Sequence, residues 1–464
     1  MSRLPVVAIV GRPNVGKSTL FNVLTRTRDA LVADTPGVTR DRIYGRARVG
    51  GRDVIVIDTG GLDDSDDEII SAARSQTRLA VGEADVVLLV TDARAGLMPA
   101  DRDIASWLRK QNKPLLHAVN KSDGLDEDQV VVESAELGIE PQCLIAASHK
   151  RGLEHLGREL ADILPPAESV EADDDEGIHL ALIGRPNVGK STLLNRMLGE
   201  ERALATPHAG TTRDPVHGRI EREGQVFHLV DTAGIRRRRG SHTGLEGFST
   251  IKAMQAMERA EVVALLIDAS EGVTDQDARL AGHVMEAGRA LVLVLNKWDS
   301  LSEKQREKIL VQMAERLDFA TFAPVVTASA LHGSGLGEFT DAVRHVYGCA
   351  NQELSTSALT RVLRKAVQVH PPPGGKRATP KLRYAHAGGS FPMRVIIHGN
   401  RTGQVPDSYR RYLINSLRKH FDFTGVPIHL LFKDSDNPYA GRRNKLTPRQ
   451  IQKRKRVRKL GRRR

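Results

Sequence analysis

The sequence is poor in cysteine and aromatic residues, and it contains no long apolar run. Its 464 residues include only Cys143 and Cys349, too few for a disulfide framework and without metal-ligand spacing, so we expect a reducing, cytoplasmic compartment. An aromatic content of 4% argues against a chain-long series of stacking platforms for single-stranded nucleic acid. The apolar run Val6–Val10 is too short for a secretory signal, and no uncharged stretch approaches the roughly 20 residues that cross a bilayer.

Positive charge is abundant, but it is concentrated at one end of the chain. The net charge is +12. Residues 351–464 hold 27 Lys and Arg against 5 Asp and Glu, a net charge of +22, so residues 1–350 carry −10. A mildly acidic body with a strongly basic end predicts a polyanionic partner for that end.

The sequence contains one domain twice. At roughly 150 residues per domain, the length predicts about three domains. The string GRPNVGKST at 11–19 recurs letter for letter at 184–192, and Asp-Thr-x-Gly at 58–61 recurs at 231–234 with the same offset. Asn-Lys-x-Asp at 120–123 recurs at 296–299, with a slightly larger offset. Because several motifs repeat in the same order, we interpret them as a tandem duplication.

Each copy alternates short apolar runs with helical stretches, which predicts an α/β fold with a mainly parallel sheet covered on both faces. The expected strands are Val6–Val10, Val54–Ile57, Val86–Val90 and Leu115–Val119 in the first copy, and Leu180–Ile183, Val226–Val230, Val262–Ile267 and Ala290–Leu295 in the second.

The remaining segments complete the predicted organisation. Residues 1–164 and 178–350 are the two copies, joined by a linker at 165–177 with six acids and no base, which favours a solvated tether over a binding segment. Residues 351–440 predict a smaller α/β domain: helix Ala358–Val369, strands Leu382–Ala385 and Met393–His398, a helix through Tyr409 and His420, and strand Ile428–Phe432. The tail at 441–464 has 13 basic residues and no acid, so we expect it to be disordered in isolation.

Gly-x4-Gly-Lys-Ser after a strand is typical of a phosphate-binding loop, in which backbone N–H groups and a helix N-terminus face phosphate oxygens. The lysines should reach the β- and γ-phosphates, and the serine hydroxyls should bind Mg²⁺. The predicted loops are Gly11, Arg12, Pro13, Asn14, Val15, Gly16, Lys17, Ser18 and Thr19, and Gly184, Arg185, Pro186, Asn187, Val188, Gly189, Lys190, Ser191 and Thr192.

Two further motifs are typical of switch segments around a γ-phosphate. An aspartate at a strand end suits the Mg²⁺ shell, the last glycine of Asp-Thr-x-Gly offers an N–H to the γ-phosphate, and a loop threonine can order around both. The predicted members are Thr39, Asp58, Thr59, Gly60, Gly61 and Leu62, and Thr212, Asp231, Thr232, Ala233, Gly234 and Ile235.

Asn-Lys-x-Asp predicts a guanine reader, because a carboxylate accepts from both N1–H and the N2 amine, a donor pair that adenine lacks. This motif favours GTP over ATP. The residues are Asn120, Lys121, Ser122 and Asp123, and Asn296, Lys297, Trp298 and Asp299, with Ser329 and Ala330 as a supporting loop in the second copy. The first copy has Ala146 and Ala147 there, so it loses the hydroxyl while a backbone contact can survive.

These motifs resemble the Era-like branch of the translation-factor-related GTPases, and in particular the EngA family of bacterial GTPases with two tandem G domains and a KH-like C-terminal domain. The resemblance covers residues 1 to about 440 and also rests on 58–66, 231–237 and 408–413. It implies Mg²⁺-dependent GTP hydrolysis and a role in large-subunit (50S) ribosome assembly through nucleotide-dependent association with the particle and its rRNA. We expect a monomer that binds neither DNA nor a membrane.

Hydrolysis needs a positioned water and positive charge near the β–γ bridge. Leu62 and Ile235 stand where many GTPases carry a glutamine, so intrinsic turnover should be slow. The resemblance implies that K⁺, held partly by Asn14 and Asn187, supplies the missing charge; the alternative is that these asparagines only stabilise the turn. The predicted catalytic set is Lys17, Lys190, Thr39, Thr212, Asn14 and Asn187.

The basic end leaves several partners open. The KH-like domain lacks a Gly-x-x-Gly loop, since the glycines at the ends of 399–403 are too far apart, which argues against sequence-specific single-strand binding there. Arg411, Asn415 and Arg418 share a helical face that is either solvated or docks against the second G domain. The tail lacks the amphipathic and lipidation patterns that would favour a membrane surface. The resemblance to a ribosome-assembly GTPase implies phosphate-rich rRNA as its partner, and the alternative is a switch that acts on a protein or a membrane surface, with the tail as an electrostatic anchor. Arg236–Arg239 either touches RNA or is solvated.

Overall fold

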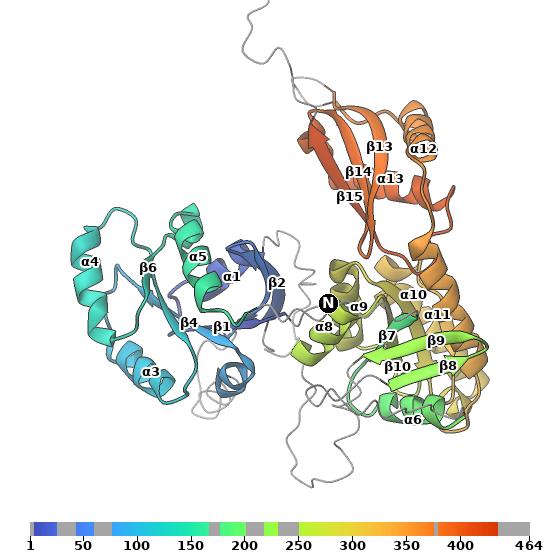
Figure 1. Ribbon diagram of the computed structural model, residues 1–464, viewed down its shortest axis with the longest axis horizontal. Coiled ribbons are helices and arrows are strands. Elements are labelled where there is room, and N and C mark those ends of the chain that lie inside the picture. The colour runs from blue at the N-terminus through green and yellow to red at the C-terminus, as the bar shows by residue number, and fades with distance from the viewer. Residues whose placement is uncertain are drawn as a thin grey trace, which may run out of the picture. The chain divides into compact units, whose positions relative to one another are not determined.

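The computed structural model describes residues 4–25, 43–59, 77–166, 177–200, 218–230, 250–374 and 379–434. They fall into two compact units. Unit 1 comprises Met1–Gln352 with 390–393 and Phe423–Pro427, and unit 2 comprises Glu353–Gly389, Arg394–Asp422 and Ile428–Arg464. Unit 1 contains two six-stranded sheets and unit 2 one three-stranded sheet, each with its own helices (Figure 1).

The first sheet has the strand order β2-β3-β1-β4-β5-β6, and all strands are parallel except β2, which runs antiparallel to β3. All four predicted strands are present, and β2 and β6 add edge strands that were not predicted. The elements are β1 (Val6–Val10), α1 (Lys17–Thr25), β2 (Ile43–Val49), β3 (Arg52–Asp58), β4 (Val86–Asp92), α3 (Pro99–Arg109), β5 (Leu115–Asn120), α4 (Glu127–Ser134), β6 (Gln142–Leu144) and α5 (Leu153–Ile163).

Alternate residues of the first sheet pack on its two faces, as the period of a strand requires. Val7 and Ile9 join a buried cluster with side chains of α1 and α5. Val6 and Ala8 join a second cluster with side chains of α3. The sheet is therefore covered on both faces, which explains why its strands read as continuous apolar runs.

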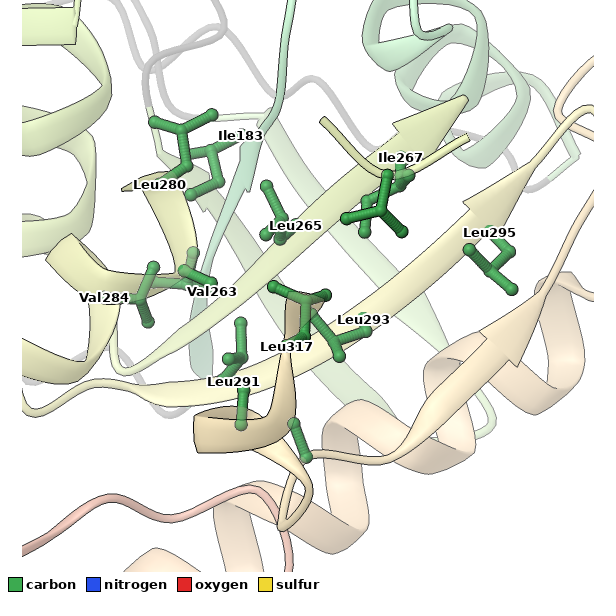
Figure 2. Close-up of a cluster of buried hydrophobic side chains, with 14 of the residues drawn as sticks. Ile183, Val263, Leu265, Ile267, Leu280, Val284, Leu291, Leu293, Leu295 and Leu317 are labelled. Carbon is green, nitrogen blue, oxygen red and sulfur yellow. The ribbon is translucent and has the colours of Figure 1, made fainter. Parts of the chain in front are cut away.

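The second sheet repeats this topology, with order β12-β11-β10-β7-β9-β8 and only β8 antiparallel to its neighbour. Figure 2 shows its core, where Val263, Leu265 and Ile267 of one strand belong to the same buried cluster as Leu280 and Val284 of a covering helix. The elements are β7 (Ile178–Ile183), α6 (Lys190–Glu200), β8 (Gly218–Arg222), β9 (Gln225–Val230), α8 (Thr250–Arg259), β10 (Val262–Asp268), α9 (Asp275–Ala287), β11 (Ala290–Asn296), α10 (Glu303–Arg316), β12 (Val325–Thr327) and α11 (Leu336–Asn351).

Unit 2 has the predicted helix–strand–strand–helix–strand order: α12 (Thr356–Val369), β13 (Lys381–Ser390), β14 (Met393–Asn400), α13 (Asp407–Arg418) and β15 (Ile428–Asp434), with sheet order β13-β14-β15. The two helices are joined by a hydrogen bond from the Tyr412 hydroxyl to Ala366 O at 2.9 Å. On the predicted polar face of α13, Arg411 and Asn415 are exposed, whereas Arg418 is half-buried and burial lowers its pKa to about 10.

Phe423–Pro427 belongs to unit 1, where it meets residues around the second sheet. Gly425 N donates to Phe322 O at 2.8 Å, and Gly425 O accepts from Leu291 N at 2.7 Å. A Cβ at Gly425, whose φ is +71°, would lie 2.5 Å from the Val346 side chain, so this close approach needs a glycine. Among the residues that the structure describes, no helix is long and apolar enough to span a membrane.

Candidate nucleotide sites

Both predicted phosphate loops connect a buried first strand to the helix that follows it. Each loop has a left-handed asparagine, Asn14 with φ 64° and Asn187 with φ 63°, and a left-handed glycine shortly after it. The lysine that begins the helix folds back on the loop: Lys17 Nζ is 2.8 Å from Arg12 O, and Lys190 Nζ is 2.8 Å from Gly184 O. The loop thus curls around the ammonium group and leads directly into a helix N-terminus, the arrangement that suits a phosphate.

The second glycine of each loop faces the asparagine of Asn-Lys-x-Asp. A Cβ at Gly16 would lie 2.4 Å from Asn120 Nδ2, and one at Gly189 would lie 2.1 Å from Asn296 Nδ2. Asn120 donates to Val15 O at 2.8 Å and accepts from Ala147 N at 3.0 Å. The amide therefore ties the phosphate loop to the loop after β6.

The second copy makes the same bridge with its own residues. Asn296 Nδ2 donates to Val188 O at 2.7 Å, and Asn296 Oδ1 accepts from Ala330 N at 2.9 Å. In both copies, therefore, this asparagine joins three loops: its own, the phosphate loop and the loop after the last strand of the sheet. The asparagine has a structural task that the sequence pattern alone did not reveal.

A carboxylate at the end of β4 or β10 holds the lysine of Asn-Lys-x-Asp. Lys121 Nζ lies 2.6 Å from Asp92 Oδ2 and 2.8 Å from Asn14 O, and Lys297 pairs in the same way with Asp268. Burial opposes ionisation of Asp92, but the hydrogen bond from Lys121 and backbone N–H groups hold its pKa below the usual value. These aspartates were not predicted from the sequence, although they recur with the same offset as the Asn-Lys-x-Asp motif, which was an available signal.

The two predicted guanine-reading carboxylates have different surroundings. Asp123 Oδ2 is 2.6 Å from Arg94 Nη2 in the first copy. In the second, a hydrogen bond with Ser329 lowers the pKa of Asp299, and His332 Nε2 lies 3.4 Å from its carboxylate. Ser270 occupies the position of Arg94 in the second copy, so the pairing with arginine distinguishes the first site.

The loop arginine is anchored to a helix start in both copies, and this contact was not predicted from the sequence either. Arg12 Nε is 3.1 Å from Asp101 Oδ2, and Arg185 Nε is 3.1 Å from Asp277. Both aspartates are fully buried and also accept from the backbone N–H that precedes their helix, in a capping box. One carboxylate thereby fixes a helix N-terminus and a phosphate loop together.

The other predicted residues are only partly described. Asp58 is buried at the end of β3, and Thr59 Oγ1 donates to Ile9 O at 2.7 Å. Ser18 is exposed and Ser191 is half-buried, each as the second residue of its helix. The following predicted residues, together with Arg236–Arg239, lie outside the described residues: Thr39, Gly60, Gly61, Leu62, Thr212, Asp231, Thr232, Ala233, Gly234 and Ile235.

Comparisons with known proteins identify the family. A family described as 50S ribosome-binding GTPase matches residues 6–121 and 179–297, and the KH-domain-like family of EngA bacterial GTPase enzymes matches 353–433. The GTPase Der of Shigella flexneri serotype 5b (strain 8401) is 50% identical over 483 aligned positions, covering 98% of this chain and 99% of the relative. The chain belongs to the Der (EngA) family of GTPases. The Escherichia fergusonii Der shows the same identity and coverage.

Membership in the Der family makes the chain a GTPase, which binds GTP and GDP, with Mg²⁺ as the general metal partner of such sites. Among solved structures, a probable GTP-binding protein engB is 24% identical and covers 34% of this chain and 97% of its own, with a TM-score of 0.30. Era in complex with MgGDPNP and nucleotides 1506-1542 of 16S ribosomal RNA is 21% identical over 61% of this chain and 99% of its own, with a TM-score of 0.32.

Proposed function

We propose that the chain is a GTP-controlled switch in assembly of the 50S ribosomal subunit, and that its nucleotide state regulates association with the particle and its rRNA. In this proposal 1–164 and 178–350 are the G domains, 351–440 is the KH-like domain, and the monomer uses 441–464 as a basic arm. The observation that carries it is the match of both G domains to a family described as 50S ribosome-binding GTPase. The net charge of +22 after residue 350 supports a polyanionic partner.

The residues fit a bound Mg²⁺–nucleotide complex. The glycines of both loops stand where a Cβ would meet neighbouring atoms, so the backbone forms a close cradle, and hydroxyl and carboxylate oxygens are the ligands that Mg²⁺ prefers. When bound, Mg²⁺ neutralises charge that develops on the phosphates. The proposed holders are Ser18, Thr39 and Asp58, and Ser191, Thr212 and Asp231.

Lys17 and Lys190 are proposed to donate to the β- and γ-phosphates. Each ammonium group lies within hydrogen-bond distance of loop carbonyls at the start of its helix, which supports this role. Asp123 and Asp299 are proposed to accept from guanine N1–H and N2. Comparing GTP turnover of Lys17→Ala and Lys190→Ala separates the two domains: each variant should retain the activity of the intact domain, and full activity in both would contradict the assignment.

Asn14 and Asn187 are proposed to hold K⁺ near the phosphates. Both are exposed on the left-handed turn of the loop, and the sequence places Leu62 and Ile235 where a glutamine would orient water. We expect GTP turnover to rise several-fold in potassium chloride relative to sodium chloride at matched ionic strength, and Asn14→Ala with Asn187→Ala to abolish the difference. Equal turnover in both salts would contradict the potassium assignment without contradicting GTP hydrolysis itself.

Cosedimentation with 50S particles tests the ribosomal role. The full chain is mixed with 50S, 30S or no particles in GTP, GDP or a nonhydrolysable GTP analogue. We expect the 50S-bound fraction to differ between the GTP analogue and GDP. Pelleting that ignores nucleotide, or association with vesicles of anionic lipid in preference to 50S, would contradict the proposal and favour a different partner.

A further inference from the structure

The three-stranded sheet of unit 2 has one covered face and one open face. Residues along β14 alternate without interruption: Met393, Val395 and Ile397 are buried, whereas Arg394 and His398 are exposed or half-buried. The buried side faces α12 and α13, which lie on one side of the sheet (Figure 1). Among the described residues of unit 2, no helix covers the other side.

Three rings from β13 and β14 stack on this open face. The Tyr384 and His398 rings are 4.5 Å apart with an interplanar angle of 5°. His386 lies 5.1 Å from His398 at 25° and 6.4 Å from Tyr384 at 24°. Tyr384 is 41% exposed, and His386 and His398 are half-buried, so the group of near-parallel rings is accessible. We call Tyr384, His386 and His398 the ring platform.

Charge around the ring platform is positive. On the open face the basic side chains are Arg394, which shares the register of His398, and Lys433, which lies near His398. Lys381 and Arg383 have the register of the buried Ala385, and the one acidic side chain of the three strands, Asp434, has the register of the buried Ile428. The Asp434 carboxylate accepts from Thr402 N at 2.7 Å and from Thr402 Oγ1 at 3.0 Å, so it is engaged at the strand end. A positively charged surface attracts the phosphate groups of a nucleic acid. The exposed rings add a second preference, for a partner with planar groups that can stack on them.

The surroundings of His398 favour its neutral form. Desolvation, together with the nearby His386 and Lys433, lowers the pKa of His398 below its usual value. An uncharged imidazole beside Tyr384 stacks without the repulsion that a cation would feel from Lys433. The ring platform is thus suited to a flat, uncharged base, and the surrounding Lys and Arg to the phosphates that flank it.

We propose that the open face of this sheet binds unpaired RNA bases by stacking on Tyr384 and His398. This inference rests on the proposed rRNA partner and gives it a location. It differs from binding through a Gly-x-x-Gly loop, which the chain lacks. A base-paired helix keeps its bases stacked inside, so the face should prefer single-stranded RNA to a duplex with the same number of phosphates.

Binding of an unstructured RNA 12-mer to the full chain tests the proposal. The oligonucleotide carries one 2-aminopurine, whose fluorescence falls on stacking, and a duplex of equal phosphate number is measured beside it. We expect Tyr384→Ala and His398→Ala each to weaken single-strand binding about 5-fold or more and to remove the fluorescence change. Duplex binding should be unchanged, and Tyr384→Phe should restore both signals.

Two control variants separate stacking from charge and from folding. His420→Ala removes an exposed histidine at the end of α13, on the helix side of unit 2, and should leave single-strand binding unchanged. Arg394→Gln with Lys433→Gln should weaken single-strand and duplex binding alike and reduce the salt slope by about 2. If Tyr384→Ala binds the 12-mer like the unchanged chain, or loses the duplex equally, the inference is overturned.

The same variants distinguish this inference from the proposed function. The proposed function is tested by the unchanged chain, through its GTP turnover and its nucleotide-dependent pelleting with 50S. The stacking inference is tested by comparing Tyr384→Ala with that unchanged chain. If pelleting stands while Tyr384→Ala keeps its preference for single strands, only the ring platform is wrong. If Tyr384→Ala loses 50S association but not oligonucleotide binding, the open face takes a ribosomal protein and the stacking inference also fails.

Discussion

Gly16 has a steric reason to be glycine beyond its left-handed φ of 96°. An alanine there would place Cβ 2.4 Å from Asn120 Nδ2 and displace the amide that bridges two loops. Strain and two weakened hydrogen bonds predict that Gly16→Ala loses about 3 kcal/mol of nucleotide binding in the first G domain, roughly a 100-fold change. Titration with fluorescent GDP measures it, with the second domain silenced by Lys190→Ala.

Gly51→Ala is the matched control for that substitution. Gly51 has a similar left-handed φ of 83°, but an added Cβ would meet nothing within 4 Å. It should therefore reduce stability slightly and leave GDP affinity unchanged. Equal loss of affinity in the two variants would show that backbone strain, rather than contact with Asn120, decides the effect.

His117 makes the first G domain sensitive to acid. It is fully buried in β5, its Nε2 is 2.8 Å from Thr91 Oγ1, and burial lowers its pKa to about 4 from 6.5. The unfolded chain therefore binds a proton more readily than the folded one between these values. Stability is full above about pH 6.5 and falls as the pH drops towards 4, by about 3 kcal/mol in total.

The second copy supplies the variant that tests this. Ile267 and Leu293 occupy the positions of Thr91 and His117 there, at the offset that relates the two Asn-Lys-x-Asp motifs. The double substitution Thr91→Ile with His117→Leu should remove most of the acid sensitivity. Hydrogen-exchange protection of β4 and β5 between about pH 4.5 and 7.5, compared with β10 and β11 in the same chain, measures it. An unchanged pH profile would assign the sensitivity to other groups.

Helices α3 and α9 each begin with an aspartate that also holds the arginine of a phosphate loop. Among the described residues, Asp101 is the carboxylate that pairs with Arg12 in the first copy. In the second copy Arg185 pairs with Asp277 and also with Glu271, at 2.8 Å. We therefore expect Asp101→Asn to lower GDP affinity and local stability by about 2 kcal/mol, and Asp277→Asn to have a smaller effect. Asp103→Asn, an exposed neighbour on α3, is the control; equal effects of Asp101→Asn and Asp103→Asn would rule out the anchor.

The contrast between predicted and missed elements has a physical basis. Strands such as Val86–Asp92 were predictable because a parallel strand buried on both faces is apolar throughout. Strand β2, with sequence IYGRARV, sits at a sheet edge, where half-exposed polar residues hide the pattern. The phosphate and guanine motifs were predictable because they recur with fixed spacing. Asp101 also recurs, as Asp277, but one carboxylate at a helix start reads as an ordinary cap, so the recurrence alone does not predict its contact with the loop arginine.

At the scale of the whole chain, charge separates nucleotide binding from partner binding. The first 350 residues carry a net charge of −10 and contain both copies of the nucleotide motifs, whereas the remainder carries +22. Association with 50S should therefore weaken as salt rises, because neutralising phosphates releases bound counterions. GTP turnover without particles should depend on salt much less, since loop contacts such as those of Lys17 are short and partly buried.

Deleting 441–464 tests that separation in one step. The deletion removes 13 basic residues and no acid, so the net charge changes from +12 to −1. We expect weaker 50S association at low salt, a flatter dependence of log affinity on log salt, and unchanged GTP turnover. A tail of the same length with Ser and Gly in place of Lys and Arg should behave like the deletion. If that neutral tail binds 50S like the full chain across the salt range, the tail contributes by its length or specific sequence, and the electrostatic account of the basic end is wrong.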